Sequence, residues 1–445
     1  MMWLAAAAIA SPSARKYSLD LAKYPNARCL DGSPGAFYIS LPATPSPRWY
    51  IYQRGGGFCT TLEDCETRSH TDLGSSLAAH WPAAIDLDSY AQFMGFDRNV
   101  TKNPLLSGFA HVFLVCKCGV FGTAPVEPRV GCPNLNAGPT PLHRCFSDCD
   151  GAYFSGSNST RTVAPRSGAV LHFRGQEIFE ATVQTLVAEH GLGAAAATEV
   201  VLGGCSAGGI ATFAHADWAG RVLAAAGALP RGTSRYSAFP ISGYYLDVDY
   251  FTDQKRFPYA QSNVSASLDA RCVAEQSAAS PPTPHKCLVA SVNARFLRTP
   301  TFVFQSKYDA DQLASSFNPP CTDAVCADPY AANLSASIAR ELWGDGDGDG
   351  DGGRGGGRDG RRDGGRDGGG EGAGGANGNG GFVDGCWHHC SYAPGKGDNV
   401  GAIAAADGTT PLQGFAQWYA SQAPGGKRWT QHAPTFPCTA CCSVS

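Results

Sequence analysis

Apolar runs of strand length alternate with stretches of helical periodicity along most of the chain. Trp49–Gln53, Ala110–Val115 and Thr301–Gln305 are short and apolar, which is typical of buried strands. Gln176–Glu189 carries apolar residues at the spacing of an amphipathic helix. Between residues 16 and 343 this alternation predicts a mostly parallel sheet with helices on both faces.

A long tract of unusual composition interrupts this pattern. From Gly344 to Gly381 nearly every residue is Gly, Asp or Arg, and no apolar residue is larger than Ala. Such a segment buries too little surface to offset the entropy of ordering, so we expect 344–381 to be a disordered surface insertion. The chain then resumes, with Gly414–Tyr419 as a final helix. We therefore expect one α/β-hydrolase-like domain made of residues 16–343 and 382–445.

The first residues have a different character from the rest. Met1–Ser11 is a short apolar run that ends in small residues and has no basic segment before it. We expect residues 1–15 to be a short or truncated signal segment, with a short anchor as the alternative. Later runs fall short of the roughly eighteen apolar residues of a spanning helix, so we expect no stable membrane insertion.

The most informative motif is the seven-residue turn Gly203-Gly204-Cys205-Ser206-Ala207-Gly208-Gly209, which stands between a strand pattern and a helix pattern. It matches G-x-S-x-G at Gly204, Ser206 and Gly208, the elbow that exposes a nucleophilic serine. A phosphate loop would need a Gly-Lys-Ser/Thr ending, and a dinucleotide fingerprint would need G-x-G-x-x-G. Since the turn has neither pattern, Ser206 is the candidate nucleophile.

Two carboxylates compete to be the partner acid. Asp309 and Asp311 both follow the strand pattern Thr301–Gln305, downstream of Ser206. A carboxylate just past the end of a parallel strand lies at the same edge of the sheet as the elbow. The order nucleophile, acid, histidine is that of α/β-hydrolases. The alternative for Asp309 is an ordinary loop cap.

Two adjacent histidines complete the candidate triad. His388 and His389 stand between Cys386 and Cys390, and either imidazole can take the serine proton while a carboxylate orients it. The alternative is a zinc cluster with the two cysteines. Structural zinc sites usually add a second spaced ligand pair, and none stands nearby. We therefore expect no metal ion, and the proposed chemistry needs no organic cofactor.

A glycine-rich loop offers the third part of an esterase site. Arg54-Gly55-Gly56-Gly57-Phe58-Cys59 follows the strand pattern Trp49–Gln53. Backbone N–H groups of such a loop can bind the oxyanion of an ester's tetrahedral intermediate, together with the N–H of the residue after the nucleophile. Gly56, Gly57 and Ala207 are the candidate donors. The alternative is a flexible turn, which a lone Gly-Gly-Gly without this context would favour.

Composition limits the compartment and the partners. The 445 residues carry a formal net charge of −4 at pH 7, which gives no case for nucleic-acid binding. The 18 cysteines are too many for a reduced cytosolic hydrolase and predict a disulfide-rich secreted protein. Cys59 and Cys65 are a possible local bridge. Asn-X-Ser/Thr sequons agree with secretion; they are at Asn99, Asn158, Asn263 and Asn333.

Several ordered blocks resemble one known family. They are CLDGSPGAFY (29–38), GGGFC (55–59), CDGAYFSG (149–156), FRGQ (173–176), GCSAGG (204–209), ISGYYLD (241–247), YDADQ (308–312) and CWHHC (386–390). In these blocks the chain is similar to the pectin acetylesterase family, which includes the Notum-type carboxylesterases. The resemblance of YDADQ to YDxxQ selects Asp309 as the acid, and that of CWHHC to CFAHC selects His389 as the base.

The resemblance implies a fold and a reaction. It implies an α/β-hydrolase-like fold, with a mostly parallel sheet, flanking helices and disulfide-rich loop insertions. It also implies a secreted, monomeric serine carboxylesterase that removes acetyl esters from cell-wall polysaccharide, because Cys205 resembles the plant-type elbow. One alternative is a lipid deacylase of an acylated protein. Another is a secreted glycan-binding protein that has lost catalysis.

The chain departs from the family pattern in three places. Residues Lys117–Ser147 insert a loop with three cysteines, and Gly344–Gly381 is the low-complexity tract. In the ISGYYLD block, Ile241 stands where the family has Asp. None of the three removes a candidate triad residue, but the first leaves the choice of substrate open.

Overall fold

The computed structural model describes residues 13–77, 79–87, 95–114, 149–230, 232–344, 378–391, 403–421, 426–431 and 436. Most of the sequence-predicted elements lie inside these ranges. The inserted loop Lys117–Ser147 and residues 345–377 of the low-complexity tract lie outside them, so our expectations for those segments remain predictions.

One ten-stranded sheet, ordered β12-β11-β10-β9-β8-β3-β5-β2-β1-β4, organises the described residues. Pairing is parallel from β12 to β5, whereas β2, β1 and β4 add an antiparallel edge. The central strands are buried on both faces, which explains their continuous apolar runs. The strands of this sheet are β1 Ser13–Ser18, β2 Ala36–Ser40, β3 Arg48–Gln53, β4 Ala84–Asp86, β5 Ala110–Leu114, β8 Glu199–Cys205, β9 Arg235–Ile241, β10 Phe302–Ser306, β11 Gly380–Asp384 and β12 Arg428–Thr430. A separate antiparallel pair consists of β6 Thr162–Val163 and β7 Val170–Leu171.

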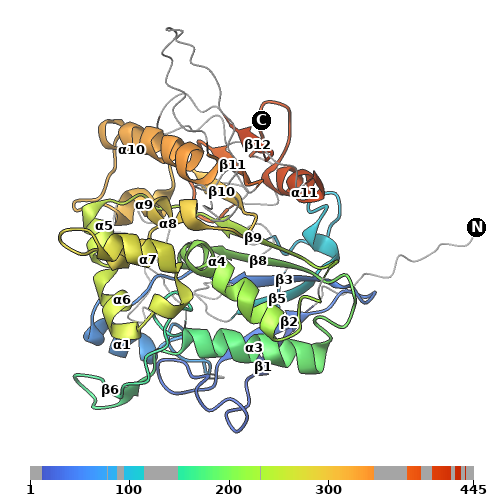
Figure 1. The fold of residues 1–445 in the computed structure, drawn as a ribbon, viewed down its shortest axis with the longest axis vertical. Coiled ribbons are helices and arrows are strands. Elements are labelled where there is room, and N and C mark those ends of the chain that lie inside the picture. The colour runs from blue at the N-terminus through green and yellow to red at the C-terminus, as the bar shows by residue number, and fades with distance from the viewer. Residues whose placement is uncertain are drawn as a thin grey trace, which may run out of the picture.

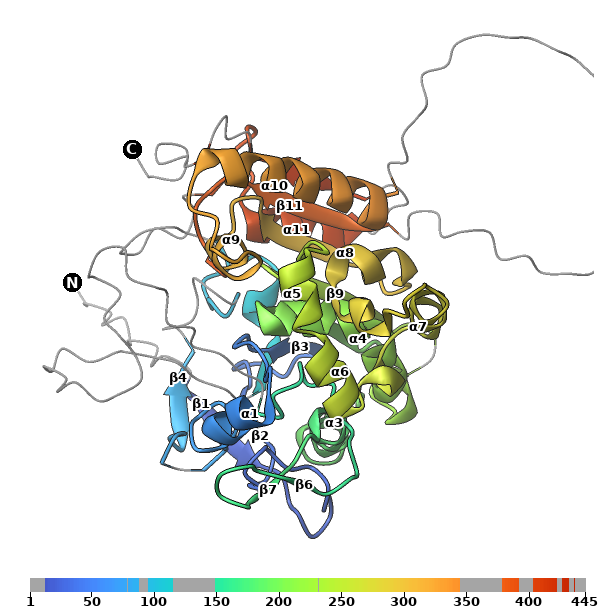
Figure 2. The same cartoon turned by 90° about the vertical axis from the view of Figure 1, so that its left-hand side faces the viewer.

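Helices cover both faces of the sheet. The α-helices are α1 Leu62–Ser69, α3 Gly175–His190, α4 Ala207–Ala225, α5 Asp249–Asp253, α6 Arg256–Ser262, α7 Ala270–Ser277, α8 Ala290–Asn293, α9 Ala310–Ser315, α10 Ala324–Ser337 and α11 Pro411–Ser421. Short 3-10 segments are η2 Leu106–Gly108, η3 Ser265–Ser267, η4 Pro284–Leu288 and η5 Ala294–Phe296, and a π-helical turn, η6 Ile338–Leu342, follows α10. Helices α4, α7 and α8 lie on the same side of the sheet, as the two perpendicular views show (Figure 1, Figure 2).

Alternate residues of one strand show how the two faces are filled. Val303 of β10 packs into a cluster with residues of α4, α8 and α10. Its neighbour Phe302 points to the opposite face, where its ring lies 5.5 Å from those of Phe415 and Trp418 on α11. This alternation follows from the two-residue period of a strand. The predicted α/β-hydrolase-like architecture, with helices on both faces of a mostly parallel sheet, is confirmed.

Two strands of the sheet extend a few residues into segments that we expected to lie outside the folded domain. Strand β1 begins at Ser13, inside the expected signal segment, because Ser13 to Arg15 pair with β4. Strand β11 begins at Gly380, inside the expected disordered tract. A Cβ on Gly380 would lie 2.5 Å from the Trp418 ring, and one on Gly381 would lie 2.9 Å from the Trp343 ring. These two glycines therefore fit beneath tryptophan rings, which composition alone did not indicate.

Five disulfides join cysteines of the described chain, and two of them, Cys29–Cys149 and Cys205–Cys390, span 120 and 185 residues. The bridges are Cys29–Cys149, Cys59–Cys65, Cys205–Cys390, Cys272–Cys287 and Cys321–Cys326. The suggested local pair Cys59–Cys65 is among them, whereas the C-terminal cysteines lie outside the described residues. Among the described helices, none combines the length and apolar character needed to cross a membrane.

Candidate active site

Ser206 stands at the sharp turn between β8 and α4. Its backbone has φ 59° and ψ −124°, a conformation that is costly for a residue with a side chain and typical of a nucleophile elbow. The Ser206 N–H donates to the carbonyl of Ile241 on β9 at 3.1 Å. A Cβ on Gly208 would lie 1.9 Å from the Gln53 carbonyl, so the turn needs glycine there. Strand contacts on both sides therefore fix the serine at the carboxyl edge of the sheet.

Asp309 and His389 form a hydrogen-bonded pair at the same edge. Asp309 is fully buried, and its two oxygens lie 2.7 Å and 2.9 Å from Nδ1 of His389. One of those oxygens also accepts the N–H groups of Asp311 and Gln312, both at 3.0 Å, at the start of α9. Asp309 is therefore a helix cap and the histidine's partner at once. Asp311 points elsewhere and accepts the hydroxyl of Tyr245 at 2.8 Å.

The neighbouring histidine has a different partner. His388 is buried, and its Nε2 lies 3.0 Å and 3.1 Å from the two carboxylate oxygens of Asp384. Its ring stacks on Phe304 with centroids 5.9 Å apart. His388 and Asp384 thus form a packed internal pair, separate from the pair at Asp309.

The carboxylates around His389 raise the pKa of its imidazole. Burial lowers the pKa of its imidazole, but the charges of Asp309 and Asp311 and the hydrogen bond that Nδ1 donates to Asp309 outweigh burial and raise the pKa to about 9. The histidine's Nε2 is buried and has no hydrogen-bond partner among the described residues. This nitrogen is therefore the one on the His389 ring that no described residue hydrogen-bonds.

A disulfide brings the serine and histidine segments together. Cys205 precedes Ser206 and Cys390 follows His389, and the Cα atoms of the bridged cysteines are 5.8 Å apart. One ring nitrogen of His389 lies within 4.8 Å of both sulfur atoms. Ser242, at the end of β9, adds a second link by accepting the Cys390 N–H on its hydroxyl at 3.0 Å. The segments that carry Ser206 and His389 are thus cross-linked, although the described hydrogen bonds include none between the two side chains.

The same bridge bears on the zinc alternative. Cys205, His389 and Cys390 are the described side chains whose ligand atoms cluster closely enough to hold a metal ion. Both sulfur atoms of this group are joined to each other, so neither is a thiolate that can bind zinc. Cys390, one of the two cysteines of the zinc alternative, therefore cannot bind zinc while the bridge is intact.

Another histidine lies beneath the elbow. His215 of α4 is buried, with Nδ1 3.2 Å from Ser155 Oγ and Nε2 2.8 Å from Gln53 Nε2. Burial lowers the pKa of His215 to about 3, so the ring stays neutral. With both nitrogens engaged, His215 ties the end of β3 to the helix behind Ser206 and is no alternative base.

The glycine-rich loop lies directly against the elbow. A Cβ on Gly55 would be 2.5 Å from the Ser206 Cβ. Within the described part of the chain, the N–H groups of Gly56, Gly57 and Ala207 donate to no protein acceptor. The Gly56 carbonyl, by contrast, accepts a hydrogen bond from Arg68 Nη1 at 3.3 Å. The three N–H groups that the sequence predicted as oxyanion donors therefore lie within two residues of Gly55 or Ser206. None of them is occupied by an acceptor of the described chain.

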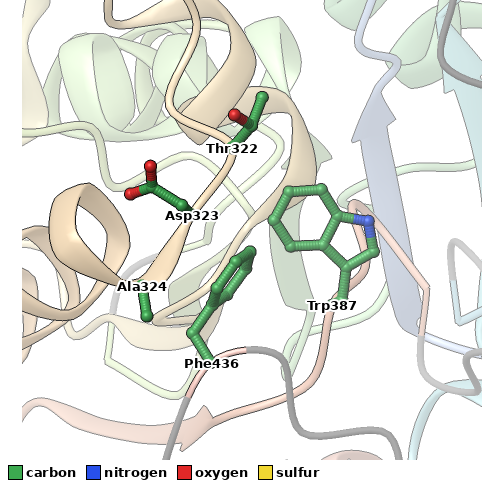
Figure 3. A pocket seen from close by; sticks show the side chains of 5 residues that line it. All are labelled: Thr322, Asp323, Ala324, Trp387 and Phe436. Atoms are coloured by element: carbon green, nitrogen blue, oxygen red, sulfur yellow. The ribbon is translucent and has the colours of Figure 1, made fainter.

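An open hollow lies beside the histidine loop. It has a volume of about 610 Å3 and is lined by Thr322, Asp323, Ala324, Trp387 and Phe436. The rings of Trp387 and Phe436 pack edge to face with centroids 5.2 Å apart (Figure 3), and Trp387 is 40% exposed. An aromatic surface is thus open to solvent two residues from His389.

Comparison with protein families gives a clear assignment. The family model described as pectinacetylesterase matches residues 11–115 and 146–336, which is most of the chain. The chain belongs to the pectinacetylesterase family. The matched residues include Ser206 and Asp309. His389 lies beyond them, so its pairing with Asp309 rests on the geometry described above.

Individual relatives of this chain come from plants and animals. Pectin acetylesterase 5 of Arabidopsis thaliana is 28% identical over 310 residues, covering 68% of this chain and 59% of the relative. Palmitoleoyl-protein carboxylesterase NOTUM of Schmidtea mediterranea is 26% identical over 330 residues, covering 68% of this chain and 51% of the relative. The aligned part therefore spans only about half to three fifths of these two relatives.

A solved structure supports the fold assignment. The Wnt deacylase Notum from Drosophila superposes with a TM-score of 0.67 at 17% sequence identity, over 97% of this chain and all of that chain. At this identity the likeness concerns the fold, and it agrees with the α/β-hydrolase-like architecture of this chain.

Motif analysis missed the structural roles of four residues at this site. Cys205 and Cys390 flank the candidate serine and histidine in sequence, and that symmetry was a usable signal for their bridge. Ser242 and Arg68 carried no comparable signal. At the departure from the family pattern, Ile241 has a fully buried side chain, and its carbonyl holds the Ser206 N–H.

Proposed function

We propose that the protein is a secreted serine carboxylesterase that removes acetyl groups from a cell-wall polysaccharide. In this proposal Ser206 is the nucleophile, His389 the general base and acid, and Asp309 the residue that orients the imidazole. The observation that carries the proposal is the His389–Asp309 pair, tethered through Cys390 to the residue before Ser206. Gly56, Gly57 and Ala207 are the proposed oxyanion donors.

The reaction follows the serine-hydrolase sequence. Ser206 Oγ attacks the acetyl carbonyl carbon while Nε2 of His389 takes its proton. The carbonyl oxygen becomes an oxyanion, which the backbone N–H groups stabilise. His389 then returns the proton to the departing sugar oxygen, leaving acetyl-Ser206. A water molecule attacks this ester by the same steps, and acetate and free enzyme result.

Family membership and disulfides support the substrate class and the compartment. Two relatives that are each 28% identical to this chain are named pectin acetylesterases. Five disulfides in the described residues agree with passage through an oxidising compartment. The second candidate function is deacylation of a lipidated protein, which the similarity to planarian Notum supports.

Acyl-chain length separates the two candidate functions. We expect kcat/KM to fall from p-nitrophenyl acetate through butyrate to octanoate. Each additional buried methylene contributes about 0.8 kcal/mol, so an acyl pocket built for lipid would produce the opposite trend. Acetate release from acetylated pectin is the companion assay. A clear preference for octanoate without release of acetate from pectin would favour the lipid deacylase.

The pKa of His389 should determine how the esterase activity depends on pH. Because only neutral imidazole accepts the serine proton, kcat/KM should rise with pH and level off above the pKa of His389, about 9. Asp311 raises that pKa by its charge. Asp311→Asn should therefore move the midpoint of the profile to lower pH.

A matched variant controls for removing a nearby carboxylate. Asp328 accepts the hydroxyl of Tyr308, the neighbour of Asp309, but does not contribute to the pKa of His389. Asp328→Asn should leave the midpoint in place. An Asp311→Asn profile that coincides with wild type, or moves to higher pH, would contradict the electrostatic account of His389.

A further inference from the structure

We propose that Arg68 is the positioning residue of the oxyanion hole, acting through the peptide bond between Gly56 and Gly57. This inference rests on the proposed esterase function and adds a residue that lies outside all the sequence motifs of the site. It starts from one contact, in which the buried Arg68 guanidinium donates to the carbonyl oxygen of Gly56 at 3.3 Å.

The contact determines the direction of a neighbouring N–H. A trans peptide unit is planar, and its C=O and N–H bonds point in opposite directions. The described cis peptide bonds lie elsewhere, before Pro281 and Pro319. Holding the Gly56 carbonyl toward Arg68 therefore directs the Gly57 N–H away from Arg68. That N–H, a proposed oxyanion donor, has no acceptor among the described residues.

The loop needs such a restraint because of its own sequence. Gly56 has φ 154° and Gly57 has φ 74°, regions that glycine enters with little steric cost. Three consecutive glycines also have more backbone freedom to lose than any other tripeptide, so an unrestrained peptide would rotate readily. A peptide that rotates through 180° would present its carbonyl instead of its N–H. The hydrogen bond from Arg68 opposes that rotation.

Arg68 is itself held firmly. Its side chain is 7% exposed, and its Nε lies 3.2 Å from a carboxylate oxygen of Asp64, one turn earlier on α1. The other Asp64 oxygen accepts the N–H of Thr60 at 2.9 Å. The Cys59–Cys65 disulfide joins the end of the glycine loop to the same helix. Helix α1 and the loop are thus one cross-linked unit.

The charge of Arg68 also acts on the donor. A cation bound to a carbonyl polarises the peptide and makes its N–H a stronger donor. An oxyanion at the Gly57 N–H would gain from that polarisation, whereas a neutral ester oxygen would gain less. Loss of Arg68 should therefore weaken transition-state binding more than substrate binding.

The experiment uses Arg68→Met, which keeps the aliphatic stem and removes the guanidinium, and Arg68→Lys, which keeps a cation. For p-nitrophenyl acetate we expect Arg68→Met to lower kcat about 10- to 100-fold with little change in KM, somewhat less than the loss of a whole oxyanion donor. Arg68→Lys should recover part of this loss. Rates are referred to active sites titrated with a p-nitrophenyl phosphonate, so unfolded protein does not contribute.

A second readout reports on the oxyanion itself. An alkyl trifluoromethyl ketone adds to the serine as a tetrahedral oxyanion, so its inhibition constant should rise by the factor by which kcat/KM falls. The matched control is Arg166→Met. Arg166 is 63% exposed and donates to the Glu63 carbonyl at 2.9 Å on the same helix, without touching the glycine loop. It should change neither quantity.

The outcomes separate this inference from the function on which it rests. If wild-type hydrolysis depends on Ser206 and Arg68→Met keeps wild-type kcat per titrated site, the positioning role is wrong and the esterase proposal stands. An equal loss in Arg166→Met would likewise refute it, because general loosening of α1 would then suffice. If the wild-type protein hydrolyses no ester in a Ser206-dependent way, the proposed function itself fails.

Discussion

Replacing Ser206 with alanine is expected to lower kcat for p-nitrophenyl acetate by about four to six orders of magnitude. The serine hydroxyl is the atom that forms the covalent intermediate, and no neighbouring hydroxyl in the elbow replaces it. Folding should be preserved, because the side chain lies at the turn between β8 and α4 and the backbone bond from Ser206 N–H to Ile241 remains. The measurement is steady-state hydrolysis, with circular dichroism to verify the fold.

A second serine provides the control for that experiment. Ser277, at the end of α7, is exposed and lies outside the site. Ser277→Ala should retain wild-type turnover. Wild-type-like turnover in Ser206→Ala would refute the serine-esterase mechanism, and with it the proposed roles of His389 and Asp309.

The second large effect is expected for His389→Ala, with a loss of kcat similar to that of Ser206→Ala. His389 is the imidazole bonded to Asp309 and tethered to the elbow through Cys390, and without it the serine proton has no acceptor. Asp309→Asn should also be damaging, because an amide can stabilise the wrong tautomer of the imidazole. Turnover and phosphonate titration of each purified variant measure these effects.

The control variant of His388 should preserve the hydrogen bond to Asp384. His388→Ala would leave the buried Asp384 carboxylate without its imidazole partner, at a cost of about 1–3 kcal/mol in stability. His388→Gln keeps a donor for Asp384 and should lose far less activity than His389→Ala. If His388→Gln were the more damaging variant, the assignment of the catalytic histidine would be shifted by one residue.

Local sequence patterns predicted the elements that carry the site. The β-strand, the glycine-rich turn and the helix around Ser206 follow from nearby residues, because steric demands at a turn are local. The strand pattern 301–305 corresponds to β10, and the helix pattern 176–189 to α3. The α/β class followed from their alternation, because strands connected through helices form parallel sheets.

The local sequence pattern did not decide between neighbouring candidate residues. Chemistry alone allowed either Asp309 or Asp311, and either His388 or His389. The family resemblance selected Asp309 and His389, and the structure pairs these two across a sequence separation of 80 residues. Asp311 instead accepts a hydrogen bond from Tyr245, and His388 is hydrogen-bonded to Asp384. The direction of each side chain depends on the strands and loops packed around it.

The sequence by itself determined the α/β class, the position of the serine elbow, the glycine loop and the set of candidate acids and bases. These features depend on short-range sterics and on hydrophobic periodicity. The tertiary structure alone decided that Cys205 bridges Cys390, 185 residues away, and that Arg68 reaches the Gly56 carbonyl. It also decided that two glycines of the low-complexity tract form the start of β11 beneath tryptophan rings. Such contacts join segments that are distant in sequence, so they exist only once the sheet has brought those segments together.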